Sequence, residues 1–199
     1  MQVVKTNHRV LGAEHPNTLT SIANLSSAFW SQGQWKEAEE LEVQVIETFK
    51  RVLGEEHPKT LSSMGNLAST FWNQERWEEA EELGMHVLEA RKWVLREEHP
   101  DTLFSMDNLA STCTNQGRWL ETIELGMQVV DMREGVLGGE HPDTLTSMAN
   151  VASTFWYLGL WKEAEHLEVH VMETLKRLLG DEHPKTLNSM YSLAYTWKS

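Results

Sequence analysis

The chain has 199 residues, of which 40% are hydrophobic and 24% charged, so its composition excludes a wholly disordered chain. Its 17 Lys and Arg against 30 Asp and Glu leave a net charge of −13, which repels phosphate groups, so we expect neither nucleic acid nor a membrane as partner. No apolar stretch approaches the ~20 residues of a spanning helix, and the first residues lack the apolar centre of a signal peptide. With one cysteine, which can form no internal disulfide, the chain is expected in the cytoplasm.

Every proline of the chain follows a histidine, and the His-Pro pairs recur at a fixed spacing of 42 residues. The pairs end at Pro16, Pro58, Pro100, Pro142 and Pro184. Such a repeat is typical of a solenoid, in which each unit buries its apolar face by stacking on its neighbours. We therefore predict one all-α solenoid domain over 1–199, which we interpret as a segment of a longer array. Its expected units are a partial one at 1–15, complete ones at 16–57, 58–99, 100–141 and 142–183, and a partial one at 184–199.

Each complete unit is predicted to contain a first helix, helix A, and a second helix, helix B. Pro58 suits the first turn of a helix A, where N–H groups have no helical partner, and apolar residues continue this helix to about Gln74. Those apolar residues are Leu61, Met64, Leu67, Ala68 and Phe71. Glycine is expected to close helix A at Gly33, Gly117 and Gly159, with Glu75 in the remaining unit. The histidines before the prolines are expected to be helix caps or loop anchors.

Helix B is predicted to begin at Trp35 and to end before Gly54, with acidic residues early and basic residues late, as the helix dipole favours. Its apolar stripe is Trp35, Ala38, Leu41, Val45, Phe49 and Val52. We interpret Trp35 and its equivalents Trp77, Trp119 and Trp161 as core residues. A second set of tryptophans lies on helix A, at the border between its core side and its polar face. A tryptophan there could pack between repeats or line the polar face. This set is Trp30, Trp72 and Trp156.

Three short patterns resemble the tetratricopeptide repeat: Leu67, Ala68 and Phe71; Gln116, Gly117 and Trp119; and Glu37, Ala38 and Glu39. The 42-residue spacing with LGxEHPxT and NLA more narrowly resembles the repeats of kinesin light chains and the C-terminal arrays of fungal and bacterial NOD-like (STAND) receptors. The tryptophan-rich, near-identical units fit the receptor arrays better. Over essentially the whole chain, the resemblance implies a right-handed superhelix of antiparallel helix pairs. It also implies a concave groove, lined by helices A, for peptides or partner proteins, without catalysis.

The polar face of helix A, opposite its core, is predicted to line this groove, because a helix turns about 100° per residue. Asparagine is a mediocre helix former, so its recurrence there favours a ligand whose backbone the amide can bond. The alternative is that these amides bond to the adjacent repeat. The predicted groove residues are Asn24, Asn66, Asn108, Asn150, Ser69, Ser111, Asn73 and Asn115.

Some predicted groove positions differ between units and would make the groove selective, since aromatic side chains beside a carboxylate suit a specific pocket. These residues are Phe104, Asp107, Tyr157 and Tyr191. Neutral drift of a tolerant surface is the alternative. Helix A carries almost no other charge between its first and last turns, so the groove is predicted to be neutral, polar and aromatic. A clamp for an acidic chain terminus would need Lys or Arg on this face and is therefore excluded.

Catalytic chemistry finds little support in the sequence. His166 and His170 are four residues apart, a spacing that metal ligands use, but no third ligand stands at a fixed spacing from them, so a solvated helix face is the simpler interpretation. Cys113 replaces an aromatic residue of the core stripe and is expected to be a buried thiol. We expect no catalytic residue, no metal and no cofactor.

The sequence therefore predicts a non-catalytic scaffold that binds a protein or an extended peptide, and the resemblance suggests the sensor array of a larger NOD-like receptor. Three alternatives stay open: a kinesin-light-chain-like cargo adaptor, a structural spacer, and an element that self-associates end to end through unpaired terminal helices. A metal-dependent enzyme would need the pair of His166 and His170.

Overall fold

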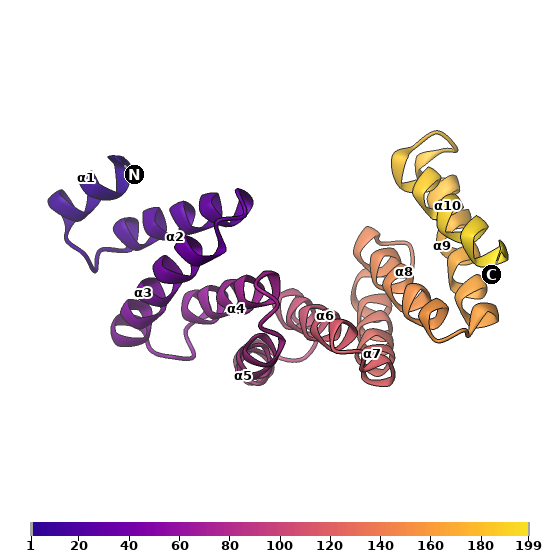
Figure 1. Ribbon diagram of the computed structural model, residues 1–199, viewed down its shortest axis with the longest axis horizontal. Coiled ribbons are helices and arrows are strands. Elements are labelled where there is room, and N and C mark those ends of the chain that lie inside the picture. The colour runs from indigo at the N-terminus through magenta and orange to yellow at the C-terminus, as the bar shows by residue number, and fades with distance from the viewer. Residues whose placement is uncertain (1, 199) are drawn as a thin grey trace. The chain divides into compact units, whose positions relative to one another are not determined.

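The computed structural model describes residues 2–198, and its regular elements over that range are all helices (Figure 1). They are α1 (Gln2–Leu11), α2 (Pro16–Ser31), α3 (Trp35–Leu53), α4 (Pro58–Asn73), α5 (Trp77–Leu95), α6 (Pro100–Asn115), α7 (Trp119–Leu137), α8 (Pro142–Tyr157), α9 (Trp161–Leu179) and α10 (Pro184–Lys198). Each even-numbered helix begins at a predicted proline and is a helix A. The helices B α3, α5, α7 and α9 begin at the predicted tryptophans. The predicted all-α class and helix order are confirmed for this range.

The chain divides into two compact units, Met1–Asn108 and Leu109–Ser199, with the boundary inside α6. In the first unit, each helix from α1 to α5 packs against the next, and in the second the same holds from α7 to α10. Both units thus have the neighbour-on-neighbour packing of a solenoid. The single domain over 1–199 and its repeat boundaries stay predictions. No helix within 2–198 has the length and apolar character needed to cross a bilayer.

The recurring His-Pro-x-Thr motif forms the first turn of each helix A. Nδ1 of His57 accepts a hydrogen bond from the backbone N–H of Lys59 at 3.2 Å, and the other His-Pro histidines accept the equivalent bond. Thr60 is fully buried, and its hydroxyl donates to the carbonyl of Gly54 at 2.8 Å. The predicted capping role of the histidines is confirmed. The threonine also ties α2, α4, α6 and α8 to the end of the helix before each of them, whereas the hydroxyl of Thr186 in α10 has no hydrogen-bond partner within residues 2–198.

The helices A α4 and α8 are each held between two helices B. In the first unit, Leu61 and Met64 of α4 pack with Ile46 of α3 and Val87 of α5. The same arrangement recurs in the second unit, where α8 packs between α7 and α9. The turns after helix A have the positive φ expected of the closing glycines, and Glu75 adopts a φ of 61° in the same place. The predicted helix A stripe and its termination are confirmed.

The tryptophans that begin helices B are less buried than predicted. Those of α3, α5 and α7 are half-buried, and Trp161 is 47% exposed. Trp35 packs edge-on against Trp30 with ring centroids 5.6 Å apart, and the α4–α5 turn has the same kind of pair. These rings cover the turn between two helices, where neighbouring side chains are fewer than at the helix centre. The core prediction is wrong for Trp161 and for Val52, which is 47% exposed in the last turn of α3.

Candidate functional site

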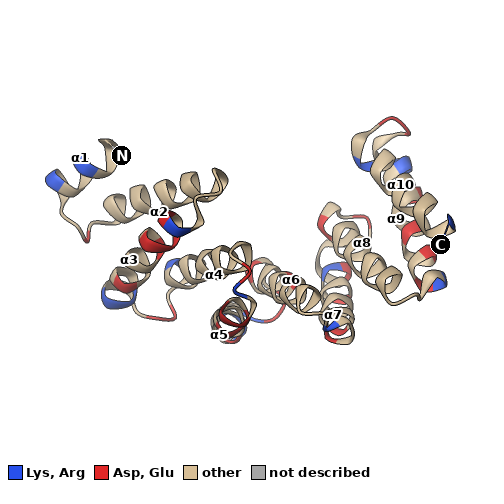
Figure 2. Ribbon diagram, viewed as in Figure 1, with Lys and Arg blue, Asp and Glu red and all other residues tan. Residues whose placement is uncertain are grey.

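The helices A present few charges beyond their first turns. Figure 2 shows α2, α4 and α8 almost without acidic or basic residues, while red segments mark the helices B and the loops that precede helices A. The face expected to line a groove is therefore mainly neutral.

Three of the predicted groove asparagines are exposed. Asn24 on α2, Asn66 on α4 and Asn150 on α8 have exposed side chains that make no hydrogen bond with any residue between 2 and 198. Bonds to the adjacent repeat, the alternative explanation for these amides, are therefore not formed there. Asn108 is half-buried. Whether these amides bind a ligand stays a proposal.

Several other predicted groove residues bond to their own helix. The hydroxyl of Ser69 donates to the carbonyl of Gly65 at 3.1 Å, and Nδ2 of Asn73 donates to the carbonyl of Ser69 at 2.7 Å. Asn115 makes the same bond to Ser111 at 2.9 Å. A ligand would have to compete with these local bonds, so the exposed asparagines are the better candidates.

The four predicted groove positions that vary between repeats differ in the exposure of their side chains. Phe104 is 56% exposed, whereas Asp107 is half-buried. Tyr157 and Tyr191 are 62% and 70% exposed. The ring of Tyr157 stacks on Trp119, at the start of α7, with centroids 5.2 Å apart. These tyrosines thus present aromatic faces to solvent.

The border tryptophans differ in their contacts: packing between repeats is formed by Trp156, whereas lining of the polar face stays a prediction. Trp156 contacts Tyr195 of the following helix A with centroids 5.1 Å apart, which is packing between repeats. Trp30, by contrast, contacts Trp35 within its own repeat and stays 39% exposed.

In the second unit, a cavity of about 530 Å³ is bounded by α8, α9 and α10. The predicted groove residue Asn150 lines it from α8 together with Ser153, and Asn188 and Ser192 line it from α10. Neither α10 residue was predicted, although Ser192 stands 42 residues after Asn150 and the repeat spacing could have found it. The structure thus brings polar residues of two consecutive helices A to one concave site.

A buried glutamate, missed by the sequence analysis, joins the first two complete repeats. Glu42 of α3 is 6% exposed and accepts hydrogen bonds from Ser26 of α2 at 2.9 Å and from Thr70 of α4 at 2.8 Å. Burial raises the pKa of Glu42 above its ordinary value, although both hydroxyls oppose the rise. Its charge therefore opposes folding near neutral pH, while its hydrogen bonds fix two helices A against one helix B.

Replacing Glu42 by glutamine should flatten the pH dependence of stability. Because the pKa of Glu42 is raised in the folded chain, the folded state holds the proton more tightly than the unfolded state. This contribution is complete below about pH 4.5 and is lost as pH rises through the folded pKa. Thermal melts between about pH 4.5 and 7.5 should therefore show a smaller decline for Glu42→Gln than for the wild type. The exposed Glu47 on the same helix supplies the control, Glu47→Gln. Equal slopes for both variants would contradict the assignment.

Arginines of helices B also reach between helices A. Arg91 is 6% exposed, and its guanidinium donates to Ser105 at 2.7 Å and to Ser62, a position on the predicted groove face, at 3.4 Å. Arg133 of α7 makes the equivalent bond to Ser147. The sequence analysis considered the charges of helix A alone and therefore missed this arginine, which reaches Ser62 from a helix B. Because Arg91 is buried among these bonds, it is a structural group instead of an open cation.

The histidine pair proposed as an alternative site lies on the surface. His166 and His170 are exposed on α9, and residues 2–198 contain no cluster of three or more His, Cys, Asp or Glu side chains placed to hold a metal ion. Cys113 is 2% exposed, so the predicted burial of this thiol is confirmed.

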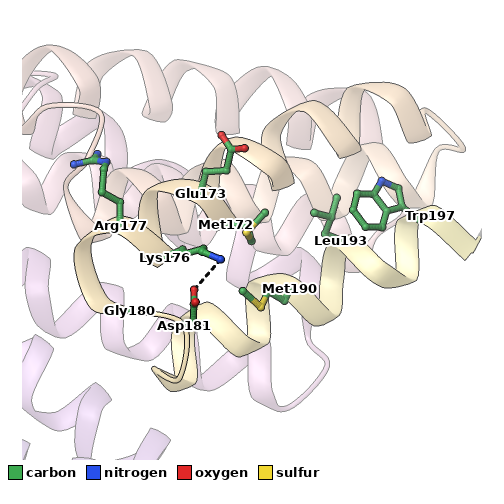
Figure 3. Close-up of a pocket in the computed structure, with 9 residues that line it drawn as sticks. All are labelled: Met172, Glu173, Lys176, Arg177, Gly180, Asp181, Met190, Leu193 and Trp197. Atoms are coloured by element: carbon green, nitrogen blue, oxygen red, sulfur yellow. Dashed lines mark ion pairs between the residues drawn. The ribbon is translucent and has the colours of Figure 1, made fainter.

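A second hollow, of about 690 Å³, is formed by α9 and α10 (Figure 3). Met190 and Leu193 line it, and their equivalents in the previous repeat, Met148 and Val151, pack under α9. Trp197 at its edge is 65% exposed and donates its indole N–H to Glu165 at 2.6 Å. The hollow also has charged lining residues, among them Lys176 and Asp181, which form an ion pair at 3.0 Å (Figure 3). End-to-end association through this face stays a proposal.

Comparison with known proteins identifies the repeat. A tetratricopeptide repeat family model matches residues 43–92 and 101–177, and a second tetratricopeptide repeat model matches residues 18–59. No curated protein matches the chain.

Solved structures agree with this assignment. The nearly identical TPR-like repeats of a candidate kinesin light chain from Podosopora anserina are 34% identical, with a TM-score of 0.82 over 92% of this chain and 87% of that one. BtubC (BKLC) from P. vanneervenii is 15% identical and shares the fold, with a TM-score of 0.84 over 99% of this chain and 80% of that one. The predicted solenoid class is confirmed, and the chain belongs to the tetratricopeptide repeat family.

Proposed function

We propose that the chain is a non-catalytic scaffold that binds an extended peptide or a protein segment along the polar face of its helices A. Membership of a family whose repeats generally mediate protein interactions supports this proposal. The neutral character of the face favours a ligand held through its backbone over one attracted by charge.

One observation carries the proposal: the exposed amides of Asn24, Asn66 and Asn150 make no hydrogen bond within residues 2–198. An asparagine costs helix stability relative to alanine, and here no bond within the described chain offsets that cost. Each amide offers both donors and an acceptor, which match the N–H and C=O groups of an extended peptide. A ligand backbone would use these groups whatever its side chains.

Alanine at Asn66 or Asn150 should weaken peptide binding by about 1–2 kcal/mol, because each replacement removes hydrogen bonds to the ligand backbone. The melting temperature should be unchanged or slightly higher, because alanine is the better helix former. The measurement is titration calorimetry with peptides selected from a random linear library on the wild-type chain. Gln44→Ala, at an exposed position of helix B, is the control and should leave affinity unchanged. Unaltered affinity in both asparagine variants would refute the proposed contacts.

For the biological setting, we propose the ligand-sensing array of a NOD-like receptor in the cytoplasm. The regular, near-identical and tryptophan-rich units support an array of this kind. A cargo adaptor related to kinesin light chains is the second candidate, favoured by the kinesin light chain named for the structure of 34% identity. The coding sequence upstream distinguishes them, because a nucleotide-binding domain would indicate a receptor and a heptad coiled coil a light chain.

A structural spacer or a self-assembling element would use the chain differently. The hollow formed by α9 and α10, which Met190 and Leu193 line, supports association through this face. Measurement of the molecular mass over a concentration series separates a monomer from such an assembly.

A further inference from the structure

In three of the complete repeats, a leucine of helix A and a valine of the helix B that follows it are buried together. The leucine follows the His-Pro-x-Thr motif, and the valine lies near the middle of helix B. The pairs that share a buried cluster are Leu19 and Val45, Leu61 and Val87, and Leu145 and Val171. None of these side chains is more than 4% exposed. Both helices of a repeat are therefore needed to bury the pair.

The same two positions are exposed on α10 and on α1. Leu187 of α10 is 52% exposed, and Val3 of α1 is 65% exposed. Within residues 2–198, α10 packs mainly against α9, and α1 mainly against α2. Met190, one turn after Leu187, lines the hollow formed by α9 and α10 (Figure 3). In the part of the chain that the structure describes, α10 thus lacks a covering helix B, and α1 lacks a covering helix A.

An ion pair joins the same two elements inside the array. Arg51 in the last turn of α3 pairs with Glu14 in the loop before α2, and α9 and the loop before α8 form the equivalent pair. At the 42-residue spacing, the matching residues are Arg9 of α1 and Glu182 before α10. Both are exposed, and neither forms an ion pair within residues 2–198. The face of α1 and the face of α10 therefore carry complementary charges.

We propose that α1 of one copy docks on α10 of a second copy and completes its repeat. Val3 then packs on Leu187 and Met190, and Arg9 pairs with Glu182, as the equivalent residues do within complete repeats. Burial of the apolar side chains drives the association, while the charges fix its register. A second copy is the occupant because α1 carries its valine and its arginine at the spacing of Val45 and Arg51 in α3.

This interface is heterologous, since it joins two different faces of the same chain. Each added copy leaves one α1 and one α10 free, so association continues beyond two copies. The inference does not depend on peptide binding, because it uses the apolar side of α10 and not the polar face of the helices A.

Sedimentation equilibrium of the 199-residue chain tests the association directly. From about 10 µM to about 1 mM, the average mass should rise with concentration and pass the mass of two copies. A constant mass of one copy would overturn the inference, and so would a mass that stops at two copies. Either result would leave the proposed peptide-binding function standing.

Aspartate on either face should weaken the association tenfold or more, because the contact would then bury a carboxylate among apolar side chains. Val3→Asp and Leu187→Asp both replace exposed side chains, so the helical circular dichroism of the single chain should be preserved. Val10→Asp is the matched control on α1: Val10 is 67% exposed, and its equivalent Val52 stays exposed in a complete repeat. This control should associate like the wild type. Association that survives both face variants, or that Val10→Asp weakens equally, would contradict the docking.

Exchange of the charges tests the register of the contact. Arg9→Glu and Glu182→Arg should each weaken association about threefold or more, since like charges then meet. In an equimolar mixture of the two variants, every contact between unlike copies joins opposite charges, so the association should recover. A mixture that associates no better than either variant alone would overturn the inference.

Discussion

Replacing Leu61 by alanine should lower the free energy of unfolding by about 3–5 kcal/mol, because it removes a large apolar side chain from a site that has little freedom to collapse. Leu61 is fully buried and lies among residues of both neighbouring helices B, which hold the cavity open from two sides. Chemical denaturation followed by helical circular dichroism measures the change. The effect is large because one residue joins three helices.

Leu187 supplies a matched control for Leu61. It occupies the same place in the His-Pro-x-Thr-Leu word of α10 but is 52% exposed. Leu187→Ala should therefore cost about 1 kcal/mol or less, since little of its surface leaves water on folding. Similar losses for both variants would mean that motif position, and not packing between helices B, sets the stability of the array.

The helices were predictable because their ends are encoded locally. The histidine cap and the proline define the start of each helix A, and the positive φ at Gly33, Gly117 and Gly159 closes it. Depth of burial was less predictable, because a periodic pattern identifies the face of a helix and not the number of neighbours around each residue. Trp161 therefore fits the apolar stripe in sequence, yet it is 47% exposed at the first residue of α9.

The exposed asparagines of the candidate site followed from the repeat, whereas the buried polar residues did not. If the 42-residue repeats are treated as identical copies, the positions at which they differ are overlooked, and the buried charged residues lie at those positions. Two sets show this when the sequence is aligned at 42 residues: Glu42, Gly84, Gly126 and Glu168; and Phe49, Arg91, Arg133 and Leu175. The hydrogen bonds of each set depend on a serine or threonine of a neighbouring helix, which only the folded chain brings close.

Gly126 shows why these differences are coupled to packing. It is buried on α7, and a Cβ atom placed there would lie 2.6 Å from Cγ2 of Val151 on α8. Val151 is 2% exposed and β-branched, so it has little freedom to move to another rotamer. The close approach of two helices thus requires glycine where the first and last complete units have glutamate.

Gly126→Ala should consequently lower the free energy of unfolding by about 1–2 kcal/mol, the net of overpacking and of the gain in helix propensity. Gly135→Ala on the same helix is the control, because its added methyl group meets no atom within 4 Å. That variant should be more stable than the wild type by about 0.5–1 kcal/mol, since alanine restricts the unfolded backbone more than glycine does. In a Val151→Ala background, the cost of Gly126→Ala should largely disappear, because the methyl group it meets is gone. Denaturant titration of the four variants measures these differences, and stabilisation by Gly126→Ala in the wild-type background would show that α7 and α8 do not approach this closely.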